Sequence, residues 1–166
     1  ITSADGDPWQ IISNLSLASI TQGPGNQQRI GRKIRVKGVV FRGRSSLGVA
    51  ANNAASPYTL DFIWDKQCNG AAPTVNTIYT SGISYALPNP ETDERFEFAK
   101  RFSRDDPNTN FNLINTKFNC NKVITYDTNT GQITDLTSNN LLVTYTCPFD
   151  ETPTMTGRLR ILYVDE

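Results

Sequence analysis

The clearest candidate for binding chemistry in the sequence is a cluster of positive charge between positions 29 and 44. These 16 residues contain seven basic side chains and no carboxylate, although the whole chain balances 16 Lys and Arg against 16 Asp and Glu. The rest of the chain is therefore net negative. Guanidinium and ammonium groups gathered in this way attract polyanions, and the backbone of a nucleic acid is the commonest of these. The candidate nucleic-acid-binding residues are Arg29, Arg32, Lys33, Arg35, Lys37, Arg42 and Arg44.

If this segment is a β-strand, its charges line a face. The odd positions from Lys33 to Lys37 then point one way, and Ile34, Val36 and Val40 point the other way. Side chains two residues apart lie roughly 6–7 Å from each other, about the spacing of phosphates along one strand of nucleic acid. Such a row can neutralise a backbone without reading bases. The alternative is a set of solvated charges that discourages unwanted edge pairing, but scattered solubility charges would not separate so well from the acidic residues.

The sequence offers little for catalysis. It has no histidine, so the common triads and the usual zinc sites lack ligands, and it has no phosphate loop. Two carboxylates can hydrolyse a glycosidic bond, and the available ones are Asp61, Asp65, Glu94 and Glu97. However, Asp61 and Asp65 alternate with an apolar face, so we expect them to face solvent. We predict no enzymatic activity, no cofactor and no metal.

Two acidic loops could supply oxygen ligands to calcium, namely Asp105-Asp106 and the series Asp127, Asn129 and Gly131. The second loop lacks the glutamate that completes a calcium-binding loop, and its residues also suit a tight turn. We therefore interpret it as a turn, with calcium between subunits as the alternative.

Aromatic residues could form a platform on which a sugar stacks. The candidates are Trp9, Tyr58, Trp64, Tyr79 and Tyr85. Trp64 is in phase with Leu60 and Phe62, which favours a core position over an exposed one. A carbohydrate-binding module is nevertheless an alternative function.

The three cysteines, Cys68, Cys120 and Cys147, include no C-x-x-C pair, so we expect free and mostly buried thiols. No apolar stretch reaches the 18 residues or so that cross a bilayer, so we predict no membrane insertion. The chain begins at Ile1 without a methionine, which permits a preceding segment.

Apolar residues recur at every second position along most of the chain, which predicts an all-β fold. We expect one domain over residues 1–166, an eight-stranded antiparallel jelly-roll sandwich with long connecting loops. The expected strands are Trp9–Leu17, Arg32–Arg44, Tyr58–Asp65, Phe96–Phe102, two within Phe111–Tyr126, Leu141–Cys147 and Arg158–Val164. The segment Val75–Tyr85 is ambiguous, and Glu91–Ala99 could hold a short helix.

Four stretches are similar to one family. Gly25–Ile34 (GNQQRIGRKI), followed by the alternating strand to Arg44, resembles the segment that opens the second jelly-roll strand in capsid proteins of small circular single-stranded DNA viruses, the circovirus-like CRESS-DNA group. Pro88-Asn89-Pro90 with the following Arg95–Phe98 resembles the mid-chain strand entry of that group. Asn139–Tyr145 resembles its penultimate strand, and Gly157–Val164 its closing strand.

The resemblance implies a coat protein that self-assembles into a small icosahedral (T=1-like) shell and packages circular single-stranded DNA on a basic inner surface. It implies a virion protein that passes through the host nucleus during assembly and meets a cell-surface receptor or glycan. Such capsids usually begin with a long Arg-rich arm, which this sequence lacks. The arm either preceded residue 1, or the segment from Arg29 to Arg44 acts alone. A coat protein of a small RNA satellite virus is a further alternative, because phosphate contacts do not distinguish DNA from RNA.

Overall fold

The computed structural model describes residues 9–12, 20–25, 27–46, 58–80, 86–104, 111–146 and 154–166. Its strands are β1 (Trp9–Ile12), β2 (Lys33–Ser46), β3 (Tyr58–Asp65), β4 (Phe96–Arg104), β5 (Phe111–Tyr126), β6 (Leu136–Ser138), β7 (Asn140–Thr146) and β8 (Thr154–Asp165). One helical turn, α1 (Val75–Ile78), and two 3₁₀ turns, η1 (Pro90–Thr92) and η2 (Ile133–Asp135), complete the described structure. The fold is all-β, as the alternating pattern predicts.

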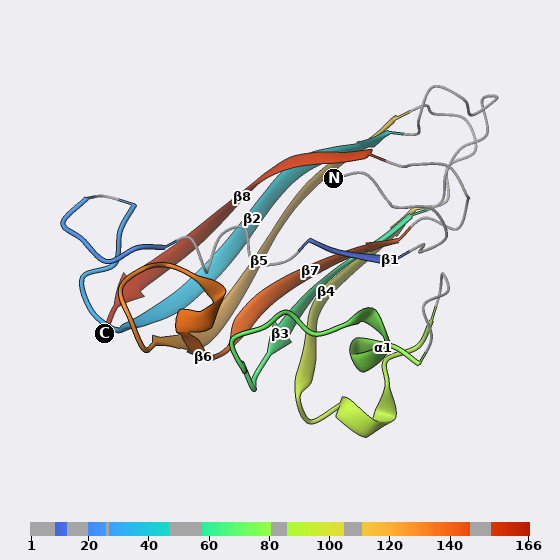
Figure 1. Ribbon diagram of the computed structural model, residues 1–166. Coiled ribbons are helices and arrows are strands. Elements are labelled where there is room, and N and C mark those ends of the chain that lie inside the picture. Colours follow the sequence, from blue (N-terminus) through green and yellow to red (C-terminus); the bar gives the residue numbers. More distant parts are fainter. Residues whose placement is uncertain are drawn as a thin grey trace.

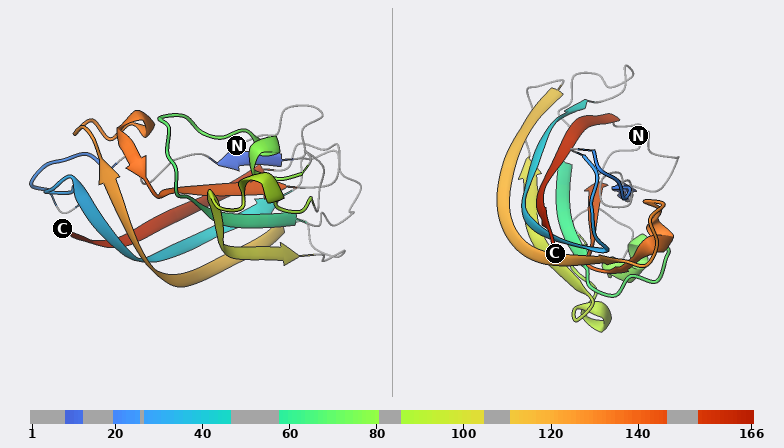
Figure 2. Two further views of the ribbon diagram at one scale, coloured as in Figure 1. Left: turned by 90° about the horizontal axis from the view of Figure 1, so that it is seen from below. Right: turned by 90° about the vertical axis from the view of Figure 1, so that its left-hand side faces the viewer.

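The strands form two antiparallel sheets that face each other (Figure 1). One sheet has the order β6-β5-β2-β8 and the other the order β1-β7-β3-β4. The long strands β2, β5 and β8 bend together around one side of the molecule, as the end-on view in Figure 2 shows. The chain passes repeatedly from one sheet to the other, so each sheet contains strands that are distant in the sequence.

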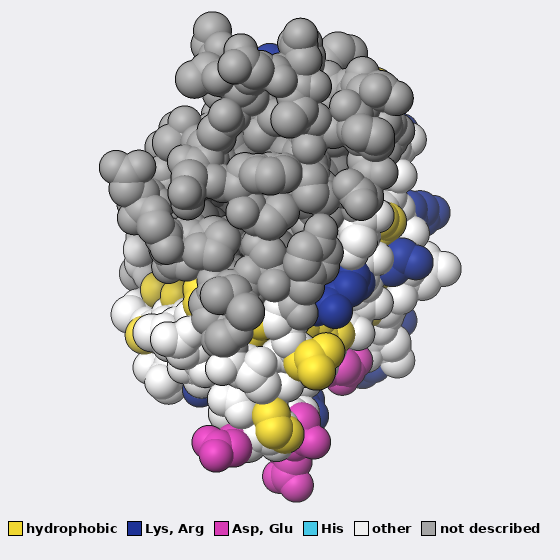
Figure 3. Space-filling model, turned by 90° about the vertical axis from the view of Figure 1, so that its right-hand side faces the viewer, with side chains coloured by type: hydrophobic (Ala, Val, Ile, Leu, Met, Phe, Trp, Pro, Cys, Tyr) yellow, Lys and Arg dark blue, Asp and Glu magenta, His cyan; other side chains and the backbone are white. Residues whose placement is uncertain are grey.

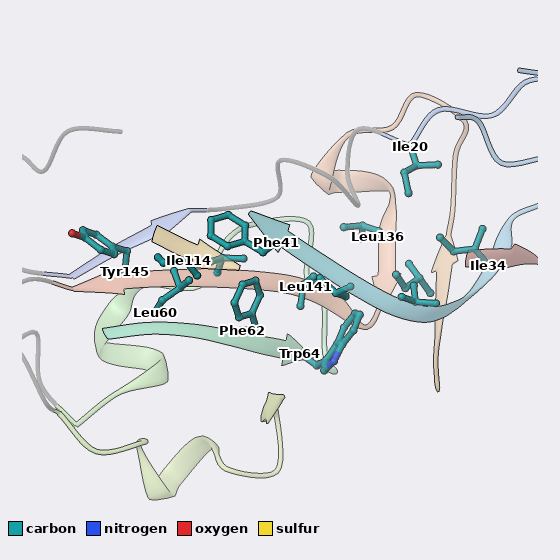
Figure 4. Close-up of a cluster of buried hydrophobic side chains, with 14 of the residues drawn as sticks. Ile20, Ile34, Phe41, Leu60, Phe62, Trp64, Ile114, Leu136, Leu141 and Tyr145 are labelled. Atoms are coloured by element: carbon teal, nitrogen blue, oxygen red, sulfur yellow. The ribbon is translucent and has the colours of Figure 1, made fainter. Parts of the chain in front are cut away.

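The main hydrophobic core lies between the two sheets. Phe41 of β2 and Phe62 of β3 meet edge to face, with ring centroids 5.7 Å apart, and Trp64 is completely buried beside them (Figure 4). The prediction that Trp64 belongs to the core is therefore confirmed. Edge-to-face ring pairs of this kind stabilise the fold by about 0.5–1.5 kcal/mol beyond the contribution of the apolar area that they bury.

The β1-β7-β3-β4 sheet is covered on its second face as well. A smaller cluster, which includes Ile63, Ile78 and Tyr79, packs α1 against this sheet. Residues 59–65 of β3 are consequently buried at every position, not at every second one. A strand between two apolar layers has no solvent side, and this changes the environment of its acidic residues.

The structure corrects several predicted elements. The segment Phe111–Tyr126 is one 16-residue strand, not two, and the ambiguous stretch after Val75 begins with a helical turn. The short helix considered for Glu91–Ala99 is reduced to η1, after which β4 begins at Phe96. The predicted loop Asp105-Asp106 and the residue Cys147 lie outside the described residues. No helix in the described part of the chain is long and apolar enough to span a membrane.

Candidate nucleic-acid interface

A β-bulge in β2 places the basic residues of this strand on one face. The register shifts between Val36 and Gly38, so Lys37 and Gly38 occupy the place of one residue relative to β8. Before the bulge the buried side chains are Ile34 and Val36, and after it they are Val39 and Phe41. Without this change of phase, Arg42 and Arg44 would point into the core. The expectation that Val40 shares the face of Ile34 and Val36 is wrong for the same reason, because Val40 lies among the basic residues.

Neighbouring strands add basic residues that the sequence analysis did not select. Arg42 lies opposite Arg158 of β8 and Asn115 of β5, and Val40 lies opposite Arg160 and Lys117. We call the resulting group the basic face. It consists of six exposed side chains on three adjacent strands, namely Lys37, Arg42, Arg44, Lys117, Arg158 and Arg160. The alternation of Arg158 and Arg160 with Leu159 and Ile161 was the available sequence signal.

The basic face has a shallow hollow at its centre. Its volume is about 630 Å³, and its lining is Val40, Arg42, Asn115, Lys117, Arg158, Leu159 and Arg160. None of the six basic side chains forms an ion pair with a carboxylate among the residues that the structure describes. Like charges directly opposite each other in a sheet destabilise it by about 0.2–1 kcal/mol per pair. A bound polyanion would remove this repulsion.

Charge is also separated over the molecular surface. In Figure 3, most of the basic side chains lie along the right-hand margin of the molecule, where an acidic side chain lies next to them, and the other acidic side chains gather at the lower end. The exposed acidic residues Glu91, Asp93 and Glu94 belong to the turn around η1, which is outside the sheet that bears the basic face. The exposed acids of the η1 turn are therefore separated from the basic face.

The remaining candidates in the basic segment have other surroundings. Arg35 pairs with Glu166, and its Nη1 donates a hydrogen bond of 3.3 Å to Asn121. Arg32 and Lys33 are exposed near the end of β2 where the chain enters the sheet. These three residues lie several positions from the hollow, so the basic face does not depend on them.

Arg29 is completely buried and contributes to the fold. Its guanidinium lies 4.0 Å from the centre of the Tyr126 ring. It donates hydrogen bonds to the carbonyl oxygens of Ile20 (3.3 Å), Gly31 (2.5 Å) and Thr128 (2.5 Å). These contacts tie the loop before β2 to the turn after β5. In this conformation the side chain has no access to a phosphate, so we leave Arg29 out of the basic face.

The expectation that Asp61 and Asp65 face solvent is wrong, because α1 and its flanking loops cover their side of β3. Both carboxylates are buried and accept two hydrogen bonds from an arginine: Asp61 from Arg101 at 2.8 and 2.7 Å, and Asp65 from Arg95 at 2.8 Å each. The hydrogen-bonded carboxylates raise the pKa of both guanidinium groups, against the opposing effect of burial. Both acids are thus held as structural ion pairs.

Tyr79 completes the network around Asp61. Its hydroxyl donates to Asp61 at 2.7 Å and lies 2.6 Å from the hydroxyl of Thr144. Burial, together with the nearby charge of Asp61, raises the pKa of Tyr79. The other proposed acids are separate: Glu97 pairs with Lys122, and Glu94 is exposed. Asp61, Asp65 and Glu97 are engaged by basic residues, so the four acids considered from the sequence do not include two free carboxylates like the acid and base of a glycosidase.

The turn from Asp127 to Gly131 is held by Asp135. Its carboxylate accepts hydrogen bonds from the hydroxyls of Thr128 and Thr130 and from the backbone N–H of Gln132. Burial alone would raise the pKa of Asp135, but these hydrogen bonds stabilise the charged form and lower it. No group of three potential metal-ligating side chains occurs within the described ranges. The hydrogen bonds to Asp135 are those of a tight turn, as the sequence interpretation expects.

The two described cysteines are half-buried free thiols. Burial raises the pKa of Cys68 to about 11, and the N–H of Asn140 donates to its sulfur at 3.2 Å. Burial also raises the pKa of Cys120. Both thiols are protonated near neutral pH, which makes them poor nucleophiles.

The proposed aromatic platform is not assembled by the residues that the structure describes. Trp64 and Tyr79 are both buried, while Tyr85 and the side chains of Trp9 and Tyr58 lie outside the described set. The two described members belong to different layers, since Trp64 packs in the main core and Tyr79 in the smaller cluster.

No family model matches the sequence, and no curated protein matches it.

Proposed function

We propose that the chain is the coat protein of a small virus, and that the basic face binds the phosphate backbone of a single-stranded DNA genome inside the shell. The observation that carries this proposal is the basic face itself: six exposed cations on three strands, without an ion-pair partner among the described carboxylates. DNA, the virion and a nuclear assembly step follow from the resemblance of the sequence to circovirus-like capsids.

We also propose that the two sheets belong to a jelly roll. The order of the strands supports this, because the chain places β2 in one sheet, β3 and β4 in the other, β5 and β6 in the first, β7 in the second and β8 in the first. Such alternation brings β8 next to β2 and β7 next to β3. Two Greek-key sheets connected in this way are typical of viral coat domains.

The chemistry of the basic face is suited to binding the phosphate backbone of a nucleic acid and not to recognising a particular base sequence. Its six members are Lys and Arg, which neutralise phosphates as point charges or as bidentate donors. The hollow is lined otherwise by Val40, Leu159 and Asn115, and no aromatic side chain lines it for stacking on bases. We therefore expect weak base preference and strong salt dependence.

Sedimentation velocity, recorded at 260 and 280 nm, tests the proposal directly. We expect a fast boundary of shell size with excess absorbance at 260 nm. Lys37→Gln with Lys117→Gln should lower the nucleic-acid content and reduce the slope of log affinity against log salt by about 1.4, since each phosphate contact on a single strand contributes about 0.7.

The matched control removes two lysines elsewhere. Lys66 and Lys100 are exposed and belong to the other part of the sandwich, after β3 and in β4. Lys66→Gln with Lys100→Gln makes the same change in net charge and should leave the salt slope unchanged. A slow monomer at every concentration would contradict the coat function, and equal slopes for the two double variants would contradict the assignment of the basic face.

A further inference from the structure

A cleft lies at the end of β8, between this strand and the loop that precedes β2. Its volume is about 490 Å³, and its lining is Pro24, Gly25, Gln28, Ile30, Ile161, Leu162, Tyr163 and Asp165. Ile30 is 71% exposed and Leu162 is 39% exposed. Both side chains line the same cleft, so together they form an apolar patch that is available to a partner.

Hydrogen bonds within the chain fix the loop that lines the cleft. The backbone N–H of Ile30 donates to Asp165 at 2.9 Å, and the side chain of Gln22 donates to the carbonyl oxygen of Ile30 at 2.6 Å. The N–H of Glu166 donates to the carbonyl oxygen of Lys33 at 3.1 Å. The apolar wall is thus fixed before anything binds, which lowers the entropic cost of association.

A second exposed apolar side chain lies at the other end of the molecule. Leu87 is 68% exposed, although its neighbour Ala86 is buried in the small cluster. Its backbone is fixed, since the N–H of Thr80 donates to the carbonyl oxygen of Leu87 at 2.9 Å. Leu87 is therefore an apolar projection held beside the segment that follows α1, and α1 lies far from the C-terminal end of β8 (Figure 1).

The charges around these two surfaces are opposite. Leu87 precedes the turn with the exposed acids Glu91, Asp93 and Glu94, and this turn is fixed to α1 by a 2.6 Å hydrogen bond from Thr92 to the carbonyl oxygen of Thr77. Figure 3 shows hydrophobic and acidic side chains together at this end. Arg32 and Lys33, two and three residues after Ile30, are exposed. The carboxylates on that side are already engaged, Asp165 by Ile30 and Glu166 by Arg35.

We propose that the cleft receives Leu87 of a neighbouring copy of this chain, with the acidic turn of that copy lying against Arg32 and Lys33. The inference rests on the proposed coat function and names one contact of the shell. Both surfaces belong to every copy but lie at opposite ends, so they cannot satisfy each other within one molecule. A contact of this head-to-tail type closes into a ring when the rotation between copies allows it, and such rings surround the symmetry axes of a shell.

Two blocked variants test the contact by complementation. Leu87→Asp removes the projection and leaves the cleft, whereas Ile30→Asp blocks the cleft and leaves the projection. Each variant alone should lose the shell-sized boundary. An equimolar mixture at several hundred micromolar should form a one-to-one dimer that cannot grow, because only one of the two possible contacts is intact in it.

Charge reversal provides a second measurement. Asp93→Lys with Glu94→Lys should abolish assembly, as should Arg32→Glu with Lys33→Glu, and the four changes combined in one chain should restore it. Leu113→Ser is the matched control, because Leu113 is 70% exposed but lies beside the basic face, opposite Arg44. This control should assemble normally, whereas Leu87→Ser and Ile30→Ser should both raise the concentration needed for assembly at least tenfold.

The outcomes separate this inference from the proposed function. Shells that form normally from Leu87→Asp would overturn the contact and leave the coat function intact. A wild-type chain that forms no shell, while the two blocked variants still dimerise on mixing, would overturn the coat function and support the contact. Unchanged thermal unfolding of each variant shows that the fold is retained, and failure of the folded variants to dimerise would overturn the contact.

Discussion

At the scale of single residues, the two members of the Asp61–Arg101 pair have unequal environments, although they make the same contact. The Asp61 side chain has no exposed surface, whereas the Arg101 side chain is 41% exposed. Without Arg101, the buried Asp61 carboxylate would keep its desolvation cost with the Tyr79 hydroxyl as its remaining hydrogen-bond partner in the described structure, whereas the half-exposed Arg101 guanidinium without Asp61 would be solvated by water. The stability of this site is therefore more sensitive to loss of the arginine than to loss of the acid.

We expect Arg101→Leu to lower the free energy of unfolding by about 3 kcal/mol, because it leaves Asp61 charged and buried. Asp61→Asn should cost about 1–2 kcal/mol, because its side-chain oxygen still accepts from Tyr79 and Arg101 turns to water. Urea unfolding of both variants checks the order of the two effects. Equal losses, or a larger loss for Asp61→Asn, would contradict this description of the pair.

The environment of Asp61 also shows what could not be predicted from the sequence for a single residue. Trp64 could be placed in the core because it is in phase with Leu60 and Phe62. Asp61 could not be placed correctly by the same rule, because alternation identifies two faces of a strand and does not say whether the polar face is covered. The cover comes from α1, a four-residue turn in a segment whose pattern favoured neither helix nor strand.

At the scale of elements, two glycines allow β2 and β8 to pack under one aromatic ring. Gly43 and Gly157 are direct partners in the ladder. A Cβ atom at Gly43 would lie 2.8 Å from the Phe41 ring and 2.8 Å from the carbonyl oxygen of Thr156, and one at Gly157 would lie 2.7 Å from the same ring. These distances are too short for real contacts, so the ring occupies the space that two side chains would need.

Gly43→Ala should lower the free energy of unfolding by about 1–3 kcal/mol, the usual cost of adding a methyl group to a well-packed site. Because the backbone oxygen of Thr156 cannot move as easily as a ring, only part of this penalty should disappear in a Phe41→Leu background. A double-mutant cycle measured by urea unfolding gives both values. A penalty that is the same in both backgrounds would mean that the ring does not fill this space.

The pairing of the long strands limited what could be predicted of the basic face. The charge of β2 was evident from the sequence, and so was its period of two. The bulge at Lys37 was not, because it follows from the register with β5 and β8, which are separated from β2 by long stretches of chain. Lys117, Arg158 and Arg160 join the basic face through the same long-range pairing, so local pattern alone could not identify them.

At the scale of the whole molecule, the basic face opposes folding and favours binding. Arg42 and Arg158 are direct cross-strand partners with like charge, and neither forms an ion pair with a carboxylate among the residues that the structure describes. Folding therefore concentrates cations that the unfolded chain keeps apart. A polyanion that binds only the folded chain offsets the repulsion among these cations and raises the apparent stability of the protein by mass action.

This opposition predicts that removing one cation from the basic face stabilises the free protein. Arg158→Gln should raise the free energy of unfolding at low salt by about 0.2–1 kcal/mol, because it removes the repulsion with Arg42. The gain should fade above roughly 0.1 M salt, where the screening length is about 10 Å. Arg35→Gln is the control, since it breaks the pair with Glu166 and should not stabilise the chain.

In the presence of single-stranded DNA at low salt the order of stability should reverse, with wild type more stable than Arg158→Gln. Thermal unfolding across a salt series, with and without an oligonucleotide, measures both effects. If Arg158→Gln were less stable than wild type without DNA, repulsion on the basic face would not destabilise the free protein. A bound polyanion would then have no such repulsion to offset.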